Sequence, residues 1–167
     1  MSEVRQQALI EAPVEVVWDV IADINRHGEW WPLTVDVDCE GLEEGCTYRF
    51  VEKLPVGTAE RQFLVEALDE CQRFRINCMG TGTFVDLTLT AARGETFVDA
   101  VAGIEPQKVR YRVFDAVAGR RFFTRWLDQS LAGLRRVACE RVAETVGDPG
   151  LEPGTSSLSE RRSNRLS

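Results

Sequence analysis

The chain has 167 residues, of which 44% are hydrophobic, so it is long enough to bury one core and fits a single domain. Its 27 acidic residues outnumber its 20 lysines and arginines, which gives a formal net charge of −7. A chain this acidic lacks the overall positive charge with which proteins bind nucleic acid or anionic lipid headgroups. No run reaches the roughly 18 apolar residues of a membrane span, and no signal-peptide pattern is present. We therefore expect a cytoplasmic protein with no nucleic-acid partner and no membrane span.

Five cysteines and one histidine limit the metal and redox chemistry that the chain can support. An odd number of cysteines with no Cys-x-x-Cys pair predicts free thiols rather than a disulfide framework or a zinc site. The single histidine, His27, lies in a polar turn at residues 25–28. We expect it to be solvated there, and the alternative is a general base at the rim of a cavity. No metal and no cofactor are expected.

The first part of the chain predicts one strand followed by two short helices. Residues 4–11 are rich in β-forming residues and end at Ala12-Pro13. Proline favours the first position of a helix, and the apolar residues after it recur at helical spacing as far as residues 23–25. We expect a second short helix at residues 26–31, which ends before the proline at residue 32.

From Val35 onward the apolar residues alternate with polar ones, a period typical of strands with one covered face. Short turns that contain glycine, proline or acidic residues separate the segments and favour hairpins. The expected strands are residues 35–40, 46–53, 59–68, 73–79, 83–91 and 96–104. Together with the first strand, they predict a seven-stranded, largely antiparallel sheet.

A long helix is expected from the Glu-Pro step at residues 105–106 to about residue 146. Its apolar residues fall on one stripe at the 3.6-residue period of a helix. The stripe consists of Val109, Val113, Ala116, Leu127, Leu131, Leu134 and Ala138. Gly119 interrupts the helix and can bend it.

The last 21 residues differ in character from the rest of the chain. Residues 147–167 show no periodicity and contain few apolar residues. We expect residues 1–146 to form the domain and residues 147–167 to be a disordered tail with no role in stability or binding.

Three motifs in this order resemble the helix-grip superfamily, the START-like and birch-pollen-allergen-like proteins. They are Ile-Glu-Ala-Pro-Val-Glu-Val-Val-Trp at residues 10–18, a segment at residues 23–32 that ends Glu-Trp-Trp-Pro, and Leu-Ala-Gly-Leu-Arg-Arg-Val-Ala-Cys-Glu at residues 131–140. Within the superfamily, the chain is similar to the polyketide cyclase/dehydrase and lipid-transport (SRPBCC) family over residues 4 to about 144. The resemblance implies an α+β helix-grip fold, in which a seven-stranded antiparallel sheet curves around a long C-terminal helix. It also implies a cavity between sheet and helix that holds a hydrophobic small molecule.

Two tryptophans and one arginine are the first candidates for contact with such a ligand. Trp30 and Trp31 offer large apolar faces, and we expect one to belong to the core and the other to reach the cavity. Arg120 lies near the centre of the apolar stripe, where its guanidinium could bind a ligand carboxylate or phenolate. Alternatively, Gly119 resets the helix phase and lets Arg120 reach solvent.

Two mid-strand carboxylates are the candidates for acid–base chemistry. Asp86 and Asp99 are each in phase with a neighbouring aromatic, and if that phase faces inward a buried carboxylate could act as a general acid or base. If the aliphatic phase marks the covered face, both carboxylates point to water. The complete set of expected ligand-binding residues is Trp30, Trp31, Tyr48, Phe50, Asp86, Asp99, Val113, Val117, Arg120 and Phe123.

Three functions are compatible with these expectations. The first is binding of a hydrophobic small molecule, lipid-, polyketide- or quinone-like, in the cavity. The second is an enzyme, a polyketide aromatase/cyclase or dehydratase, which needs an acid–base group in the cavity. The third is a protein-interaction module that acts through the sheet surface, which requires an exposed apolar patch on the strands.

Overall fold

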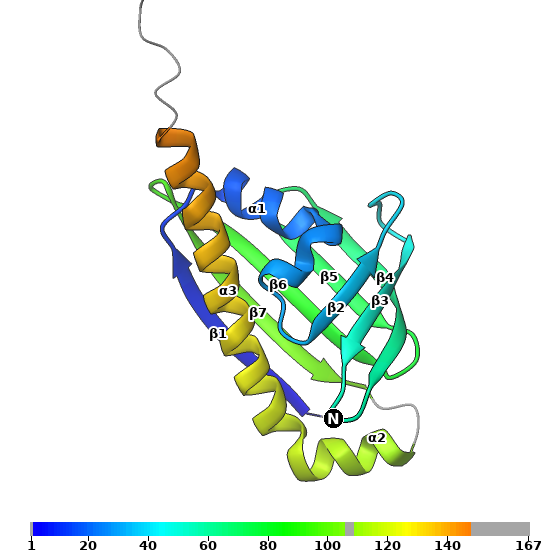
Figure 1. Ribbon diagram of the computed structural model, residues 1–167. Helices are drawn as coiled ribbons and strands as arrows, with labels where there is room; N and C mark the ends of the chain where they lie inside the picture. Colours follow the sequence, from blue (N-terminus) through cyan, green and yellow to red (C-terminus); the bar gives the residue numbers. More distant parts are fainter. Residues whose placement is uncertain (1, 106–108, 148–167) are drawn as a thin grey trace, which may run out of the picture.

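The computed structural model describes residues 2–105 and 109–147 (Figure 1). The expected start of the long helix at residue 106 and most of the expected tail lie outside the described residues. Gly147 is described, and its backbone N–H donates a hydrogen bond of 2.9 Å to the carbonyl oxygen of Ala143. That bond closes the last turn of the C-terminal helix.

Seven strands and the helical segments follow one another in the predicted order. They are β1 (Ser2–Ile10), α1 (Val14–Ala22), the 3-10 helix η1 (Ile24–Glu29), β2 (Thr34–Asp38), β3 (Thr47–Lys53), β4 (Thr58–Asp69), β5 (Arg73–Cys78), β6 (Thr83–Ala92), β7 (Glu95–Ile104), α2 (Val109–Phe114), the π-helical turn η2 (Asp115–Gly119) and α3 (Arg120–Val146). Each predicted strand is present and shifted by at most two residues at either end, so the strand prediction is confirmed.

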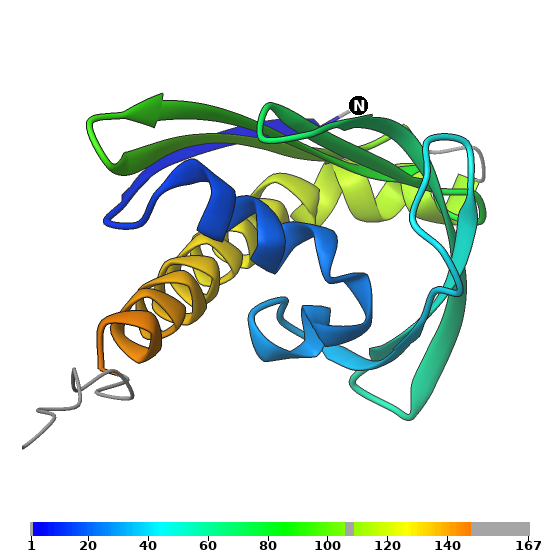
Figure 2. The same cartoon turned by 90° about the horizontal axis from the view of Figure 1, so that it is seen from above.

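All seven strands form one antiparallel sheet in the order β1-β7-β6-β5-β4-β3-β2. The first and last strands of the sequence are neighbours. The helices α1 and η1 connect the edge strand β1 to β2 at the opposite edge of the sheet. Register shifts interrupt the β2–β3 and β4–β5 ladders. Such irregularities increase local twist and bend. The sheet curves strongly, and α1, η1 and α3 lie inside its concave side (Figure 2).

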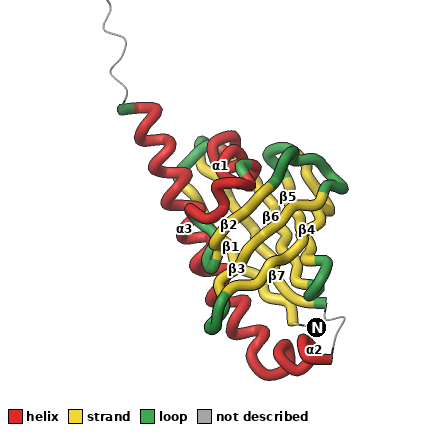
Figure 3. Tube along the Cα trace, turned by 45° about the vertical axis from the view of Figure 1, so that its right-hand side comes forward, coloured by secondary structure: helices red, strands yellow, loops and turns green. Residues whose placement is uncertain are grey.

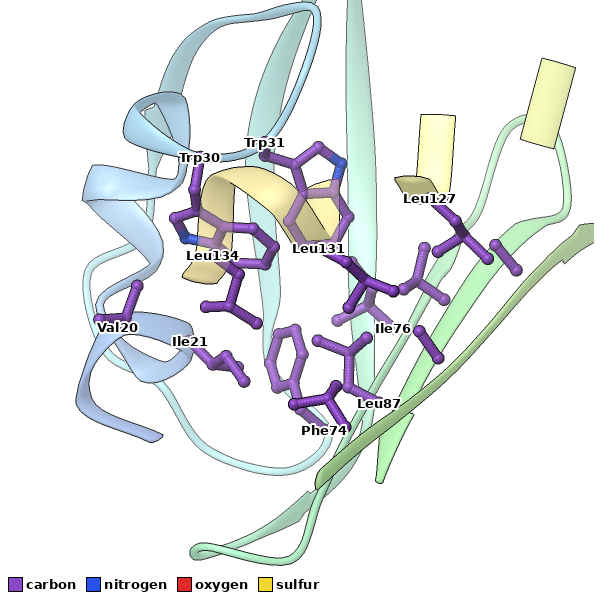
Figure 4. Close-up of a cluster of buried hydrophobic side chains, with 14 of the residues drawn as sticks. Val20, Ile21, Trp30, Trp31, Phe74, Ile76, Leu87, Leu127, Leu131 and Leu134 are labelled. Atoms are coloured by element: carbon purple, nitrogen blue, oxygen red, sulfur yellow. The ribbon is translucent and has the colours of Figure 1, made fainter. Parts of the chain in front are cut away.

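The core lies between the concave face of the sheet and α3, as the alternation in the strands predicts. Phe74 and Ile76 of β5 and Leu87 of β6 point toward Leu131 and Leu134 of α3 (Figure 4). The helix packs against β1, β7 and α1. At the closed end, the buried hydroxyl of Thr96 donates a hydrogen bond of 2.8 Å to the carbonyl oxygen of Ala12. This bond ties the turn before α1 to the start of β7.

The C-terminal helical region is bent, and its apolar stripe is buried over only part of its length. The expected stripe is buried at Leu127, Leu131, Leu134 and Ala138. The expectation is wrong for Val109, Val113 and Ala116, which are exposed. The π-helical turn η2 contains the cause, because its wider turn shifts the helical phase between α2 and α3. α2 therefore runs off at an angle to α3 and crosses the end of the sheet (Figures 1 and 3).

Candidate functional site

A pocket of about 540 Å³ opens at the end of the molecule where α2 crosses the sheet. Its walls come from the strands β3 to β7, the segment before β2, the turn after β3, the helix α2 and the first turns of α3. The lining residues are Trp31, Pro32, Leu33, Phe50, Glu52, Lys53, Leu54, Pro55, Arg61, Phe63, Cys78, Thr81, Thr83, Val85, Ile104, Arg110, Tyr111, Phe114, Phe122, Phe123 and Trp126.

The inner part of the pocket is apolar. Phe63, Val85 and Ile104 come from the inward phase of three strands, and Phe123 comes from α3; all four are buried. Trp126 lies one helical turn after Phe123 and closes the wall toward the core. The bend at η2 directs α2 across the end of the sheet, so side chains of α2 form one wall of the pocket.

Charged side chains stand at the rim. The guanidinium of Arg61 donates from Nε to a Glu52 carboxylate oxygen at 2.8 Å, and its Nη2 lies 2.7 Å from the same oxygen. Partial burial lowers the pKa of Arg61, but the hydrogen bond and charge of Glu52 outweigh this and hold the pKa above its ordinary value. Arg110 donates from Nη2 to the phenol oxygen of Tyr111 at 3.0 Å, and Tyr111 also interacts with Arg61. The rim therefore presents two guanidiniums joined through one phenol.

An aromatic cluster forms the floor between the pocket and the core. His27 stacks on Trp31 with ring centroids 5.0 Å apart, and it meets Trp30 and Phe74 edge to face. Its Nε2 lies 2.7 Å from the carbonyl oxygen of Ile21. Complete burial lowers the pKa of His27 to about 4. His27 is neither solvated nor at a cavity rim, so both expectations for it are wrong, and it is a neutral core residue.

Trp31, Phe50 and Phe123 are the expected site residues that line the pocket. Trp30 is buried to the same degree as Trp31, and both border a void of about 10 Å³, but Trp30 does not line the pocket. Tyr48 is a core residue whose ring stacks on Phe63 at 5.7 Å. Burial raises the pKa of Tyr48, so its hydroxyl stays protonated. Both tryptophans therefore belong to the core, and Trp31 is the one of the two that also lines the pocket.

Asp86 and Asp99 lie on the opposite face of the sheet from the pocket. Asp86 accepts hydrogen bonds from Arg73 at 2.7 and 3.0 Å and from Arg75 at 3.1 Å. Asp99 is paired with Arg5 at 3.3 Å. The inward phase of β6 and β7 is the aliphatic one, as in the alternative considered from the sequence. Neither carboxylate is placed to act on a molecule in the pocket.

Val113, Val117 and Arg120 are exposed and do not line the pocket. Their expected position assumed an unbroken helical phase from residue 105 to residue 146. The π turn at Asp115–Gly119 breaks that phase, and Arg120, which follows it directly, is exposed. This corrects the expectation that the three side chains face the cavity.

Sequence reasoning missed most of the rim and part of the interior. Arg61 shares the inward phase of β4 with Phe63, and that phase was a usable signal once the covered face was known. Trp126 follows Phe123 at helical spacing, which also points to a shared face. The pair of Arg61 with Glu52 depends on the register of β3 and β4, in which Phe50 lies opposite Arg61. Alternation alone does not reveal that register.

The described residues contain no cluster of histidine, cysteine or carboxylate side chains that could hold a metal ion. All five cysteines are free thiols, and Cys78 alone among them lines the pocket. Within residues 2–105 and 109–147, no helix has the length and apolar character that a bilayer crossing requires.

A curved antiparallel sheet that encloses a long C-terminal helix, with a pocket between the two, defines a helix-grip domain. The family model for polyketide cyclase/dehydrase and lipid transport matches residues 1–138. The chain therefore belongs to the polyketide cyclase/dehydrase and lipid transport family. Among curated proteins, none matches the sequence significantly.

Solved structures share the fold at low sequence identity. Protein NE0264 from Nitrosomonas europaea is 13% identical with a TM-score of 0.68, over 84% of this chain and 96% of that one. The Zhui aromatase/cyclase from Streptomyces sp. R1128 is 15% identical with a TM-score of 0.69, over 84% and 95%. The polyketide-cyclase-like protein Cgl2372 from Corynebacterium glutamicum is 17% identical with a TM-score of 0.58, over 90% and 97%. At these identities the similarity shows the fold alone.

Proposed function

We propose that the chain binds one hydrophobic small molecule that carries an oxygen-bearing end. The observation that supports this proposal most directly is the pocket of about 540 Å³ with an apolar interior. This volume falls in the range of roughly 300–1,000 Å³ that is typical of small-molecule sites. Phe63, Val85 and Phe123 would surround the apolar body of the ligand, since burial of apolar surface is the main source of affinity in such a site.

The rim supports an acceptor at the outer end of the ligand. A guanidinium has five N–H donors, and the contacts of Arg61 with Glu52 use only some of them. Arg61 and Arg110 can therefore donate to a carboxylate, phenolate or carbonyl oxygen while the Glu52 and Tyr111 contacts hold them in place. A hydrophobic molecule with such an oxygen matches both parts of the pocket.

Cyclisation of a polyketide-like substrate, the chemistry in the name of the family, is the alternative function. It requires a proton donor or acceptor in the pocket. The candidates taken from the sequence, Asp86, Asp99 and His27, are not among the lining residues. Glu52 is the carboxylate among the lining residues, and its Oε1 already accepts from the guanidinium of Arg61 at 2.7–2.8 Å, so it is held at the rim rather than aimed at the apolar interior. The geometry therefore favours binding over catalysis.

The role of the pocket can be tested by filling it. The wild-type chain should bind the neutral dye Nile red with about one-to-one stoichiometry and should gain thermal stability from it, because a ligand specific for the native state stabilises that state. Thr83→Trp places an indole in the pocket and should abolish dye binding. Thr88→Trp is the matched control on the outward phase of the same strand, and it should bind as the wild type does. Equal dye binding by all three proteins would contradict the proposal.

The rim can be tested with an anionic dye, anilinonaphthalene sulfonate, beside the neutral one. A charge-assisted hydrogen bond contributes about 1.5–3 kcal/mol, so Arg61→Gln should weaken the sulfonate dye by one to two orders of magnitude and leave Nile red nearly unchanged. Arg120→Gln removes an exposed arginine outside the pocket and should change neither affinity. An equal loss of sulfonate-dye affinity in both variants would mean that the dye responds only to the overall positive charge of this end of the molecule.

A further inference from the structure

Apolar side chains gather on the outer surface of the helical end beside the pocket. Val109, Val113 and Val117 follow one another at helical spacing, and they are 74%, 58% and 82% exposed. Phe114 and Phe122 are partly exposed next to them and also line the pocket. In the turn after β3, on the other side of the pocket opening, Val56 is 90% exposed. A contiguous exposed apolar patch of this kind is typical of a surface that binds another molecule or a membrane.

The same helical end is positively charged although the whole chain is acidic. Residues 109–125 contain five arginines and one acidic residue, Asp115. Every other described arginine except Arg93 lies within 4 Å of a carboxylate, as in the pairs Arg49–Asp36, Arg73–Asp86 and Arg135–Glu11. In the part of the chain that the structure describes, no acidic side chain pairs with the following arginines of this segment: Arg112, Arg120, Arg121 and Arg125. These four charges are available to an external anion.

We propose that α2 and the first turns of α3 dock this end of the molecule on an anionic lipid bilayer. We call the surface formed by Val109, Val113, Val117, Arg112, Arg120 and Arg121 the docking face. A helix with exposed apolar residues flanked by arginines is typical of segments that lie in the interface of a membrane, where apolar side chains enter the acyl boundary and arginines meet the headgroups. Tyr111 and Phe114 of the same helix line the pocket, so docking brings the rim of the pocket to the lipid surface.

Charge decides between lipid and a second copy of the chain. In a symmetric dimer through the docking face, the same patch meets itself, and the unpaired arginines of the two copies would lie against each other. An anionic bilayer offers the opposite charge over the same area. The net charge of −7 does not prevent this, because salt screens charges beyond about 8 Å at physiological ionic strength. The local charge of the docking face therefore governs its contact with lipid.

The docking proposal is separate from the proposed ligand and can be tested without one. The full chain is mixed with sedimenting vesicles, either of phosphatidylcholine alone or of equal parts phosphatidylcholine and phosphatidylglycerol. Binding should be found with the anionic vesicles, at least about tenfold above the neutral ones, and should weaken as salt rises. If no vesicle binding is found, dye binding in the pocket is not affected, so the two proposals can fail separately. Conversely, Thr83→Trp should lose dye binding and still bind vesicles.

Matched substitutions locate the contact. Val117→Asp places a charge on the docking face and should lower the vesicle partition coefficient more than about tenfold. Val146→Asp is the control, since Val146 is also helical and also 82% exposed but lies at the far end of α3. Each of Arg112→Gln and Arg121→Gln should lower the coefficient about fivefold, the usual contribution of one basic residue near an anionic surface.

The outcomes separate the possible occupants of the docking face. Equal binding to neutral and anionic vesicles, or an equal loss for Val117→Asp and Val146→Asp, would overturn the proposal. So would the absence of vesicle binding together with a concentration-dependent dimer, measured by analytical ultracentrifugation, that Val117→Asp disrupts and Val146→Asp does not. That result would assign the face to a second copy of the chain.

Discussion

The C-terminal helical region has two ends with the same apolar spacing and different surroundings. From Leu127 to Ala138 the apolar side chains are buried against the concave face of the sheet. From Val109 to Val117 they are exposed, and the inner side of the same segment borders the pocket instead. The π turn at Asp115–Gly119 separates the two ends. We call them the core end, residues 127–146, and the pocket end, residues 109–126.

The difference separates a part of the helical region that packs in the core from a part that borders the proposed binding pocket. The core end fills the space between sheet and helix, so its side chains contribute to the free energy of unfolding. The pocket end leaves that space open as the pocket, and Val109, Val113 and Val117 remain exposed. Substitutions at the core end should therefore change stability, and substitutions at the pocket end should change binding.

The largest expected effect is on stability at the core end. Leu134→Ala removes a completely buried side chain and should lower the free energy of unfolding by about 2–5 kcal/mol. Val117→Ala removes an exposed side chain of the pocket end and should change it by no more than about 0.5 kcal/mol. Urea denaturation of both variants measures the contrast. Similar losses for the two would mean that the pocket end is packed in solution.

Acid should weaken the core against which the core end packs, through the buried His27. The ordinary pKa of histidine is 6.5, and in the folded chain the pKa of His27 is lowered to about 4. The unfolded chain therefore binds the proton more readily, so the stability due to neutral His27 is complete above pH 6.5 and is lost as the pH falls toward 4. The loss should reach about 3 kcal/mol, and it should be visible as a falling urea midpoint across this window.

His27→Phe is the control for this titration, because it keeps an aromatic ring between Trp31 and Phe74 and removes the titrating group. Its stability should fall much less than that of the wild type between pH 6.5 and 4. Partial burial raises the pKa of Asp86, but hydrogen bonds from Arg73 and Arg75 outweigh this, so that its pKa lies below the usual 3.8. Its contribution is lost only below that value. An unchanged pH dependence in His27→Phe would assign the effect to other groups.

The sequence was sufficient for the sheet and for the core end of the helix. Strands with one covered face have a period of two, and the turn residues between them mark their ends, so all seven strands could be predicted. The spacing of Leu127, Leu131 and Leu134 predicted their burial, because residues three and four apart lie on the same face of a helix. Both signals are local, because they depend on which residues follow one another in the chain.

The parts that the sequence did not predict depend on contacts between distant segments. A π turn looks like ordinary helix in the sequence, so the phase break before Arg120 was only one of two possibilities, and the exposure of Val113 was not foreseen. His27 is polar and lies in a polar segment, yet it is buried because Trp31 and Phe74 surround it. The Glu52–Arg61 pair at the rim requires the register of β3 and β4, which alternation leaves open.

The smallest expected effects come from two glycines, one at the bend just before α3 and one in the middle of α3, and they sharpen the comparison. A methyl group on Gly133 would lie 2.5 Å from the backbone carbonyl oxygen of Trp30, which cannot move without shifting η1. Gly133→Ala should therefore cost about 1–3 kcal/mol of stability, although alanine is intrinsically the better helix former by up to about 1 kcal/mol. Gly119→Ala meets the carboxylate of Asp115, at 2.7 Å, which is a side chain rather than backbone and can give way at lower cost than the carbonyl of Trp30. Its stability should stay within about 1 kcal/mol of the wild type, because the helix propensity gained offsets part of the cost of displacing that carboxylate. Urea denaturation of the two variants, compared with the wild type, tests this, and a greater loss for Gly119→Ala than for Gly133→Ala would place the tight packing of α3 at the bend rather than at the core end.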